Sequence, residues 1–448
     1  MEICTVGGFE EVGKNMTAVK IKEDVFLFDA GLYLPGVIEL QDRLDVKSYS
    51  ESDLRRVGGI PSDKVLDKLG WTQKVKAIFI SHAHLDHVGG APYLAHRYPN
   101  AIIYGTPFTI EVLKSIVQDE NLALPNVMKK VEFAKQYTLP NASKDIRVEF
   151  IYTTHSTLDC SFVVLHTPEG CFFYALDYKF DDTPTMGSLS DYESLKRIGK
   201  EGVKIAIINT LYAGKEASNG SEKDADKMLA ETFAKVPQAQ GAFFITTFSS
   251  HIERLTNIVK HAKKTGREII FLGRSLNKYV YAAKNIGKCS FYSDVKLLKY
   301  KKQVDSFLRK LNKDRSKYVV VCTGHQGEKD SILDRISKGT TPFQFSPGDS
   351  LIFSSSVIPT EVNIEAREKL DKKLERQGVH LFKNIHVHGH GSKASKKKLL
   401  ELVKPENIIP AHGSPEQEME LIDVAKEHGY EYGKNSHIAK NGQVFTFK

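Results

Sequence analysis

The chain has 448 residues, and its 63 Lys and Arg against 55 Asp and Glu give a formal net charge of +8. This length suffices for two domains, because single hydrophobic cores stop growing at about 250 to 300 residues. No apolar segment approaches the ~20 residues that span a bilayer, and a strand-like run stands in place of a leader, so we expect a cytoplasmic protein that binds no membrane.

The cysteine pattern excludes two further classes of protein. The five cysteines are odd in number, widely scattered and without a Cys-x-x-Cys pair: Cys4, Cys160, Cys171, Cys289 and Cys322. Such spacing argues against a disulfide framework and against thiolate zinc sites. We expect reduced and mostly buried thiols.

The first strands expected along the chain are apolar runs that end at polar residues. Residues 25–28 end at Asp29, which by itself is typical of a turn. Residues 75–80 form a second buried strand, and Gly89 opens a helical stretch. The polar segment between them, residues 81–87, therefore lies on a strand-to-helix loop.

This loop, Ser-His-Ala-His-Leu-Asp-His, indicates a metal site. Alternate positions on an extended turn point the same way, so His82 and His84 can share one ion while Asp86 and His87 face a second. A helix cap would explain one Asp or Ser, but it does not require three histidines.

Three later strand ends supply further candidate ligands. His155 follows an alternating run, and Asp177 and His412 each follow an apolar run. A single His at a strand end is usually a hydrogen-bonded structural residue, but repetition after the cluster favours metal ligands. Seven ligands suffice for two metals that share one carboxylate: His82, His84, Asp86, His87, His155, Asp177 and His412.

The position of the ligands predicts an inserted domain. Six of them precede residue 180, so the segment before His412 must leave the metal fold and return. Strand-like runs at 242–245, 268–271 and 318–322 alternate with helical stretches, which predicts a parallel sheet covered by helices on both faces. We place the borders at Asn209 and Thr360, giving segments 1–208, 209–360 and 361–448, with a helix from about 361 to 377 returning the chain.

At this point the chain resembles a known family. The pattern His-x-His-x-Asp-His, followed by a single His, a single Asp and a late His, is similar to that of the metallo-β-lactamase fold. Further stretches resemble the β-CASP nucleases and, within them, ribonuclease J, in the family's order: residues 7–15, 323–328, 353–359 and 386–392. The compact length is most similar to archaeal members. The resemblance implies an α/β protein, an αββα sandwich with an inserted β-CASP domain.

The resemblance also implies a mechanism and its residues. Two zinc ions, or manganese in their place, hold a hydroxide that attacks the phosphodiester, with Asp177 bridging them. Asp86, Asp177 and His390 are expected to be catalytic, His390 as proton donor to the departing oxygen. Asp29 resembles an aspartate that orients a metal-bound histidine, and Asp159 matches a position near the metals. The implied phosphate-binding residues are Ser354, Ser355, Ser356, His386, Gly389 and Ser392.

Two positions depart from the family's pattern. Asn209 stands where members usually carry an acidic residue that pairs with the histidine matching His390. An amide can hold an imidazole but cannot stabilise its protonated form by charge. His325 stands where bacterial members commonly have Ser. These departures imply an activity that is lower, shifted in pH or lost.

Charge points to a polyanionic substrate. Several basic clusters are present, at 260–267, 296–302, 309–317 and 393–398, and the group near Lys396 is the strongest candidate for a phosphate contact. We expect single-stranded RNA, because only an unpaired strand can reach metals in a cleft between two domains. The resemblance implies 5′-to-3′ exonuclease action that prefers 5′-monophosphate ends, and it leaves endonuclease action and a homodimer open.

Two other functions stay open. A small-molecule ester or thioester hydrolase would use the same seven ligands, but it leaves the inserted residues and the basic clusters unexplained. A catalytically weakened RNA-binding protein is conceivable because of Asn209, but it gives no reason to retain the ligands.

Overall fold

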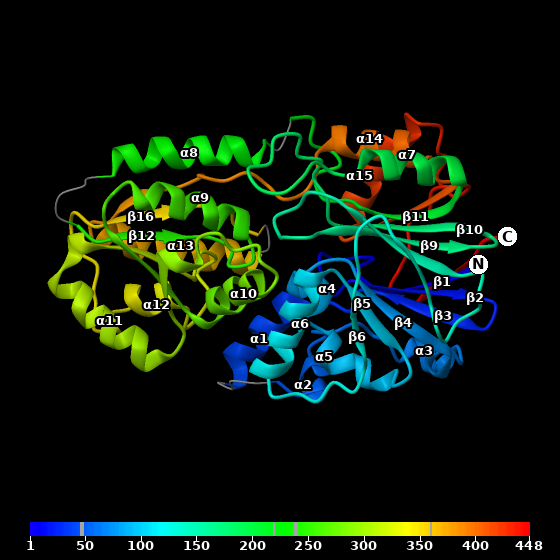
Figure 1. Cartoon of the computed structure of the whole chain (residues 1–448), viewed down its shortest axis with the longest axis horizontal. Coiled ribbons are helices and arrows are strands. Elements are labelled where there is room, and N and C mark those ends of the chain that lie inside the picture. Colours follow the sequence, from blue (N-terminus) through cyan, green and yellow to red (C-terminus); the bar gives the residue numbers. More distant parts are fainter. Residues whose placement is uncertain (45–48, 218–219, 237–240, 359–360) are drawn as a thin grey trace. The chain divides into compact units, whose positions relative to one another are not determined.

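The chain forms two compact units in the computed structural model (Figure 1). Unit 1 contains Met1–Asp182, Ser188–Asn219 and Gly389–Lys448, and unit 2 contains Thr183–Gly187 and Gly220–His388. The structure describes residues 1–44, 49–217, 220–236, 241–358 and 361–448. The predicted border at Thr360 lies outside the described residues. Among the described helices, none is long and apolar enough to cross a membrane.

The first sheet of unit 1 has the order β19-β1-β2-β3-β4-β5-β6. Its parallel strands β3, β4 and β5 are almost entirely buried apolar residues, the composition that a sheet covered on both faces requires. The strands are β1 (Glu2–Gly7), β2 (Met16–Ile21), β3 (Asp24–Phe28), β4 (Val75–Ile80), β5 (Ile102–Gly105), β6 (Met128–Lys130) and β19 (Gln443–Thr446). The helices along this part are α1 (Leu34–Leu44), α2 (Glu51–Arg56), α3 (Val65–Lys68), α4 (Leu85–Val88), α5 (Ala91–Leu94) and α6 (Pro107–Asp119), and α6 packs on β5 and β6.

The second sheet of unit 1 has the order β18-β11-β10-β9-β8-β7. Its strands are β7 (Gln136–Thr138), β8 (Arg147–Tyr152), β9 (Ser161–Thr167), β10 (Gly170–Ala175), β11 (Val203–Asn209) and β18 (Asn407–Ala411). Helices α7 (Tyr192–Glu201), α14 (Lys393–Val403) and α15 (Pro415–Lys426) cover its outer face (Figure 1). Their buried Leu and Ile side chains form one hydrophobic cluster with alternate residues of β9, β10 and β11.

The main core of unit 1 lies between its two sheets. Phe28 of the first sheet meets Phe172 of the second, with ring centroids 4.6 Å apart, and also contacts Phe79 at 5.2 Å. All three side chains are fully buried. Two sheets packed face to face with helices outside them form the αββα sandwich, and this prediction is confirmed.

Unit 2 is a parallel six-stranded sheet with the order β14-β13-β15-β12-β16-β17. Its strands are β12 (Phe243–Thr246), β13 (Glu268–Leu272), β14 (Val295–Leu298), β15 (Tyr318–Cys322), β16 (Ser350–Phe353) and β17 (His380–Phe382). Its helices are α8 (Glu222–Lys235), α9 (Ile252–Lys263), α10 (Arg274–Asn285), α11 (Lys301–Lys313), α12 (Ile332–Ser337) and α13 (Glu361–Arg376). The predicted strands and helices of the insertion are confirmed to within a few residues.

The end of the insertion differs from the expectation. The helix predicted at about 361 to 377 forms as α13, but α13 and β17 belong to unit 2 and do not return the chain to the metal fold. The physical reason is packing. Leu370 and Leu374 of α13 join the hydrophobic cluster of the unit 2 sheet, and β17 pairs with β16.

Phe28→Ala tests the core between the two sheets. Removing this ring should lower the free energy of unfolding by about 3–5 kcal/mol, because the cavity cannot collapse between two sheets. Tyr432→Ala, whose side chain is 58% exposed, is the control and should change stability by less than about 0.5 kcal/mol. Urea unfolding of both variants checks this. Equal midpoints for Phe28→Ala and the parent protein would contradict the packing account.

Candidate metal centre

The ligands converge because parallel strands of each sheet end at the same edge. In the first sheet, β3 and β4 are parallel and lead to Asp29 and His82. In the second sheet, β10, β11 and β18 are parallel, and Asp177, Asn209 and His412 stand at their carboxyl ends. Residues at the carboxyl ends of neighbouring parallel strands are brought together whatever their separation in sequence.

Backbone hydrogen bonds fix the histidine-rich loop in place. The N–H of Ala30 donates to the carbonyl of His87 at 2.8 Å, and the N–H of Leu32 donates to the carbonyl of Leu85 at 2.8 Å. Between them, Gly31 lies so close to the loop that a Cβ atom there would stand 1.7 Å from the carbonyl oxygen of Asp86. Only glycine permits this approach of two backbones.

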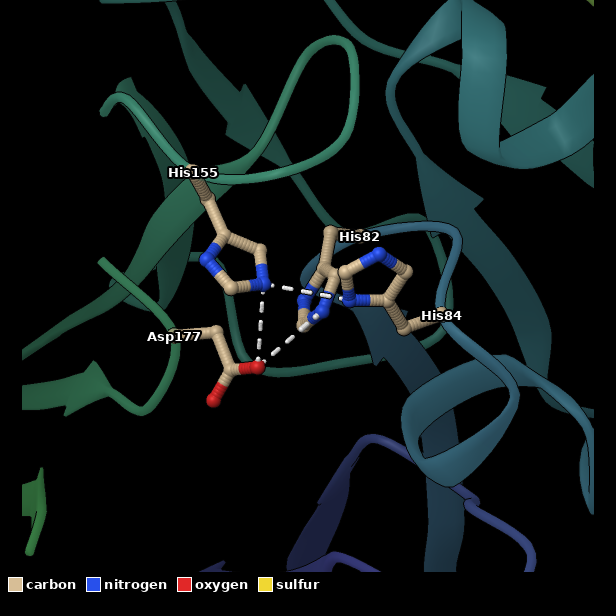
Figure 2. A group of neighbouring side chains, drawn as sticks. All are labelled: His82, His84, His155 and Asp177. Atoms are coloured by element: carbon tan, nitrogen blue, oxygen red, sulfur yellow. Dashed lines mark hydrogen bonds and ion pairs between the residues drawn. The ribbon is translucent and has the colours of Figure 1, made fainter. Parts of the chain in front are cut away.

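One ligand group consists of His82, His84, His155 and Asp177 (Figure 2). The Oδ2 atom of Asp177 lies 3.2 Å from Nε2 of His155 and 3.5 Å from Nε2 of His82. Nδ1 of His84 lies 3.1 Å from Nε2 of His155. Burial, followed by the charges of neighbouring histidines, holds the pKa values of His82 and His84 well below their usual range, so these rings present lone pairs.

The other ligand group consists of Asp86, His87, Asp177 and His412. Nε2 of His87 lies 3.5 Å from Oδ2 of Asp177 and 3.6 Å from Asp86, and Nε2 of His412 lies 3.7 Å from Asp86. Burial opposes a charge on His87, yet Asp177, Asp86 and Asp29 raise its pKa well above the usual range. The surroundings of this ring therefore favour a cation.

Hydrogen bonds from behind orient the ligand rings. Asp29 accepts from Nδ1 of His87 at 2.7 Å and from the N–H and hydroxyl of Ser81 at 2.8 and 2.9 Å. The carbonyl of Gly389 accepts from Nδ1 of His155 at 2.6 Å. With Nδ1 engaged in this way, Nε2 of each ring faces the ligand group, as in carboxylate–histidine–metal arrangements.

Backbone strain occurs at two residues of this centre, Asp29 and His412, and also at Asp159. Asp29, Asp159 and His412 have positive φ values of 60°, 54° and 62°. Such conformations cost of order 1–3 kcal/mol for a residue with a side chain and persist where the surrounding structure enforces them. The nitrogen and carboxylate donors, their convergence and their orientation fit two divalent ions that share Asp177.

His390 lies beside this centre through Asn209. Nδ2 of Asn209 donates to Oδ1 of Asp177 at 2.9 Å and lies 3.4 Å from Nδ1 of His390. Oδ1 of Asn209 accepts from the N–H of Leu211 at 2.7 Å, which fixes the orientation of the amide. Burial, partly offset by Asp177, holds the pKa of His390 well below its usual range. The ring is therefore neutral near pH 7.

Within the basic group that the sequence favoured as a phosphate contact, Lys396 itself is buried. Its side chain is fully buried, with Nζ 3.5 Å from Oδ1 of Asn209 and 4.5 Å from the ring centre of Tyr178. Helix α14 turns this residue toward the sheet, whereas Lys393 and Lys397 pair with Glu427 at the surface. A basic cluster in sequence therefore divides between two faces of one helix.

The predicted phosphate-binding residues fall in both units. Gly389 and Ser392 belong to unit 1 with His390, and a Cβ at Gly389 would stand 2.5 Å from Oγ of Ser156. The others follow β16 and β17 in unit 2: Ser354, Ser355, Ser356 and His386. Ser355 carries a buried hydroxyl with no hydrogen-bond partner among the described residues.

Sequence reasoning missed the side chain that organises the unit 2 group. Arg254, fully buried on α9, donates to both carboxylate oxygens of Glu222 at 2.9 and 2.7 Å. Its remaining nitrogen lies 3.1 Å from Oγ of Ser354 and 3.2 Å from Nδ1 of His386. The sequence signal was only an Arg within a helical stretch, since all its partners are distant along the chain.

His325 lies in the same unit, in the loop after β15. Its side chain is buried against Phe248, with ring centroids 4.3 Å apart, and burial lowers its pKa. Neither ring nitrogen has a hydrogen-bond partner among the described residues.

Comparisons with known proteins agree with the fold. Family models match at three places: "Metallo-beta-lactamase superfamily" at residues 10–168, "Ribonuclease J, beta-CASP domain" at 240–370 and "Zn-dependent metallo-hydrolase RNA specificity domain" at 379–438. A crystal structure of a protein of unknown function from Enterococcus faecalis V583 matches with a TM-score of 0.64 at 16% identity, over 99% of each chain, which supports the fold alone.

Curated relatives cover the full chain. Ribonuclease J of Pyrococcus abyssi is 38% identical over 445 residues, 99% of this chain and 96% of the relative. Ribonuclease J of Methanocaldococcus jannaschii is 36% identical over 100% of this chain and 99% of the relative. Ribonuclease J 1 of Streptococcus pyogenes is 30% identical, and the match covers 99% of this chain and 74% of that protein.

These findings establish the class and then the family. The fold and the ligand groups define a metallo-β-lactamase-fold hydrolase with an inserted β-CASP domain. The chain belongs to the ribonuclease J family, and it is a metal-dependent hydrolase that acts on RNA. The resemblance seen in the sequence is confirmed, including its closeness to archaeal relatives.

Lys396→Met tests the buried ammonium. Burial lowers the pKa of Lys396 to about 7, against ~10.4 in an unfolded chain. At a pH between these two values, folding therefore releases a proton from Lys396. The buried ammonium destabilises the folded protein most at pH 7 and below. The Lys396→Met variant should unfold at a higher urea concentration than the parent at pH 6.5. Most of this difference should disappear at pH 9.5, and chelator is present at both pH values.

Lys398→Met, on the same helix with a side chain 39% exposed, is the matched control. The difference in urea midpoint between this variant and the parent should change much less between the two pH values. A Lys396→Met advantage that is absent at pH 6.5, or grows toward pH 9.5, would contradict the assigned protonation.

Proposed function

We propose that the protein is a zinc-dependent exoribonuclease that degrades single-stranded RNA from its 5′ end and prefers a 5′-monophosphate. The single observation that carries the proposal is Asp177, shared by two groups of metal-type ligands in a chain of the ribonuclease J family. The proposed metal ligands are His82, His84, Asp86, His87, His155, Asp177 and His412. Nitrogen and carboxylate donors suit zinc, and manganese is the alternative occupant.

The ions, when bound, supply a water-derived nucleophile at neutral pH and stabilise negative charge on the phosphate. Oδ2 of Asp177 lies within 3.5 Å of His82 and His155 on one side and of His87 on the other, so this carboxylate faces both groups. Asp86 adds a second negative charge. Asp29 accepts a hydrogen bond from Nδ1 of His87 and so orients this ring toward the site. Five of the seven proposed ligands are buried, which limits access of bulk water and strengthens these electrostatic interactions.

His390 is the proposed group at the departing oxygen. Its Nδ1 atom faces Asn209 and Asp177, so Nε2 is the nitrogen that would reach the substrate. Because its pKa is low, the neutral ring would offer the Nε2 proton as a hydrogen-bond donor to the developing charge. Asn209 thus suits a neutral His390, whereas an acid there would favour an imidazolium.

The proposed RNA-binding residues are neutral donors and backbone groups. Ser392 begins helix α14, whose N-terminal N–H groups favour a phosphate. In unit 2, Arg254 orients the hydroxyl of Ser354 and the imidazole of His386. Both residues come after the carboxyl ends of parallel strands. Ligands commonly bind at this edge of an open α/β sheet.

The place of action and the assembly are also proposals. The cysteines are free, and four of the five are buried, as expected from the sequence. Free thiols suit the reducing cytoplasm, where we propose that the protein acts. A homodimer stays a prediction.

Asn209 favours one competing function, a catalytically weakened RNA-binding protein. The amide contacts both Asp177 and His390, and unlike an acid it adds no charge that would keep the His390 ring protonated. Turnover of RNA by the natural chain excludes this function. Hydrolysis of a thioester without hydrolysis of RNA would instead support the small-molecule hydrolase considered from the sequence.

His84→Ala and Asp177→Ala test the proposed centre. Each removes a ligand, so hydrolysis of a labelled single-stranded RNA should fall at least 100-fold, and chelator should abolish the activity of the parent. Circular dichroism should show a folded protein, because the hydrophobic cores are separate from these side chains. His96→Ala, an exposed histidine of the same unit, is the control and should retain parent activity. Full activity in either ligand variant would overturn the site assignment.

The phosphorylation state of the RNA 5′ end tests whether degradation starts from that end. A pocket that satisfies a terminal monophosphate must exclude a triphosphate or leave its additional charge unpaired. Mononucleotides should therefore accumulate faster from 5′-monophosphorylated RNA than from the same RNA with a triphosphate. Equal rates, or internal fragments as the only products, would contradict 5′ exonuclease action while leaving RNA hydrolysis intact.

A further inference from the structure

A third group of metal-type side chains lies in unit 1 apart from the seven proposed ligands. His166 is near the end of β9, Cys171 is near the start of β10, and Glu201 is the last residue of α7. His166 and Cys171 are 7% and 5% exposed, whereas Glu201 is exposed. One imidazole nitrogen, the thiol sulfur and one carboxylate oxygen lie within 4.8 Å of one another.

The distances match the edges of a metal tetrahedron. Sγ of Cys171 lies 3.5 Å from Nδ1 of His166, and Oε2 of Glu201 lies 3.4 Å from the same nitrogen. Zinc bonds of about 2.3 Å to sulfur and about 2.0–2.2 Å to nitrogen and oxygen, at tetrahedral angles, give edges of about 3.5 and about 3.4 Å. Two of the three edges therefore already have the length that one bound ion requires, and the third pair of atoms lies within 4.8 Å.

Glu149 fixes the orientation of the imidazole. Its Oε2 atom lies 3.0 Å from Nε2 of His166, and Arg197 bridges Glu149 and Glu201. With Nε2 donating to Glu149, a neutral ring presents its Nδ1 lone pair toward Cys171 and Glu201. A carboxylate behind a histidine is the arrangement that orients metal ligands.

Charge balance also favours a divalent cation. Glu149 and Glu201 carry two negative charges against one positive charge on Arg197, and a bound thiolate adds a third negative charge. A divalent ion makes the group neutral, which matters because Glu149 and Cys171 are buried. The thiol proton is released to solvent as the metal–sulfur bond forms.

We propose that His166, Cys171 and Glu201 bind a third divalent ion of the zinc type, with solvent as the fourth ligand. The thiolate selects zinc or cobalt over magnesium and manganese. The ion would join the end of α7 to the β9–β10 hairpin, so its role is to stabilise unit 1. This site does not depend on the proposed ribonuclease activity.

Cobalt substitution tests the third site directly. The proposed active-site ligands are nitrogen and oxygen atoms, so only Cys171 should produce a thiolate-to-cobalt charge-transfer band in the near ultraviolet. The parent protein, stripped with chelator and titrated with Co²⁺ without oxygen, should show this band, and Cys171→Ala should lack it. After zinc loading and desalting, Cys171→Ala should retain one zinc fewer per chain and the parent rate of RNA hydrolysis.

Two further variants make the result decisive. Cys289→Ser, at the half-buried cysteine of unit 2, is the matched control and should keep both the band and the zinc content. Glu201→Gln changes an exposed residue and should keep the fold and weaken zinc binding at this site at least tenfold. Absence of the band in the parent, or equal zinc content in parent and Cys171→Ala, would overturn the proposal.

Discussion

The site depends on one carboxylate, that of Asp177, being held between two sets of histidines. Asp177 is 4% exposed and follows β10. Burial alone would favour its protonated form, but the imidazoles of His390, His87 and His412, of which His87 is the one whose surroundings favour a charge, hold the pKa of Asp177 well below its usual range. A buried anion surrounded by imidazoles is stable only with positive charge beside it, and the same balance creates a site for metal ions.

The fold brings these charged and imidazole groups together at the edges of its two sheets in unit 1. Strands β3 and β4 carry Asp29 and the histidine loop, while β8, β10, β11 and β18 carry His155, Asp177, Asn209 and His412. The aromatic core between the sheets, with Phe28 against Phe172, fixes the two edges relative to each other. The precision of the ligand geometry therefore derives from apolar packing behind it.

Much of this arrangement was predictable because it is local or periodic. The spacing of His82, His84, Asp86 and His87 specifies a ligand loop, and apolar runs locate the strands that carry the remaining ligands. The alternation of strands and helices specified the parallel sheet of unit 2. The return of the chain was harder to predict, because α13 is amphipathic and its sequence does not reveal which sheet Leu370 and Leu374 cover.

The rest depended on contacts between distant residues. Lys396 lies in a basic run, and only the packing of α14 shows that its ammonium is buried beside Asn209. Arg254 meets Ser354 and His386, which are 100 and 132 residues away along the chain. The scattered cysteines argued against thiolate zinc, whereas folding places Cys171 beside His166 and Glu201. No spacing rule in the sequence signals such encounters.

Anomalous diffraction at the zinc edge, from crystals of the zinc-loaded protein, tests the central claim most directly. We predict two peaks about 3.5–4 Å apart on either side of Asp177, with one carboxylate oxygen directed at each or one shared by both. The first peak should be ligated by His82, His84 and His155, and the second by Asp86, His87 and His412. A single peak, or two peaks without Asp177 between them, would contradict the account.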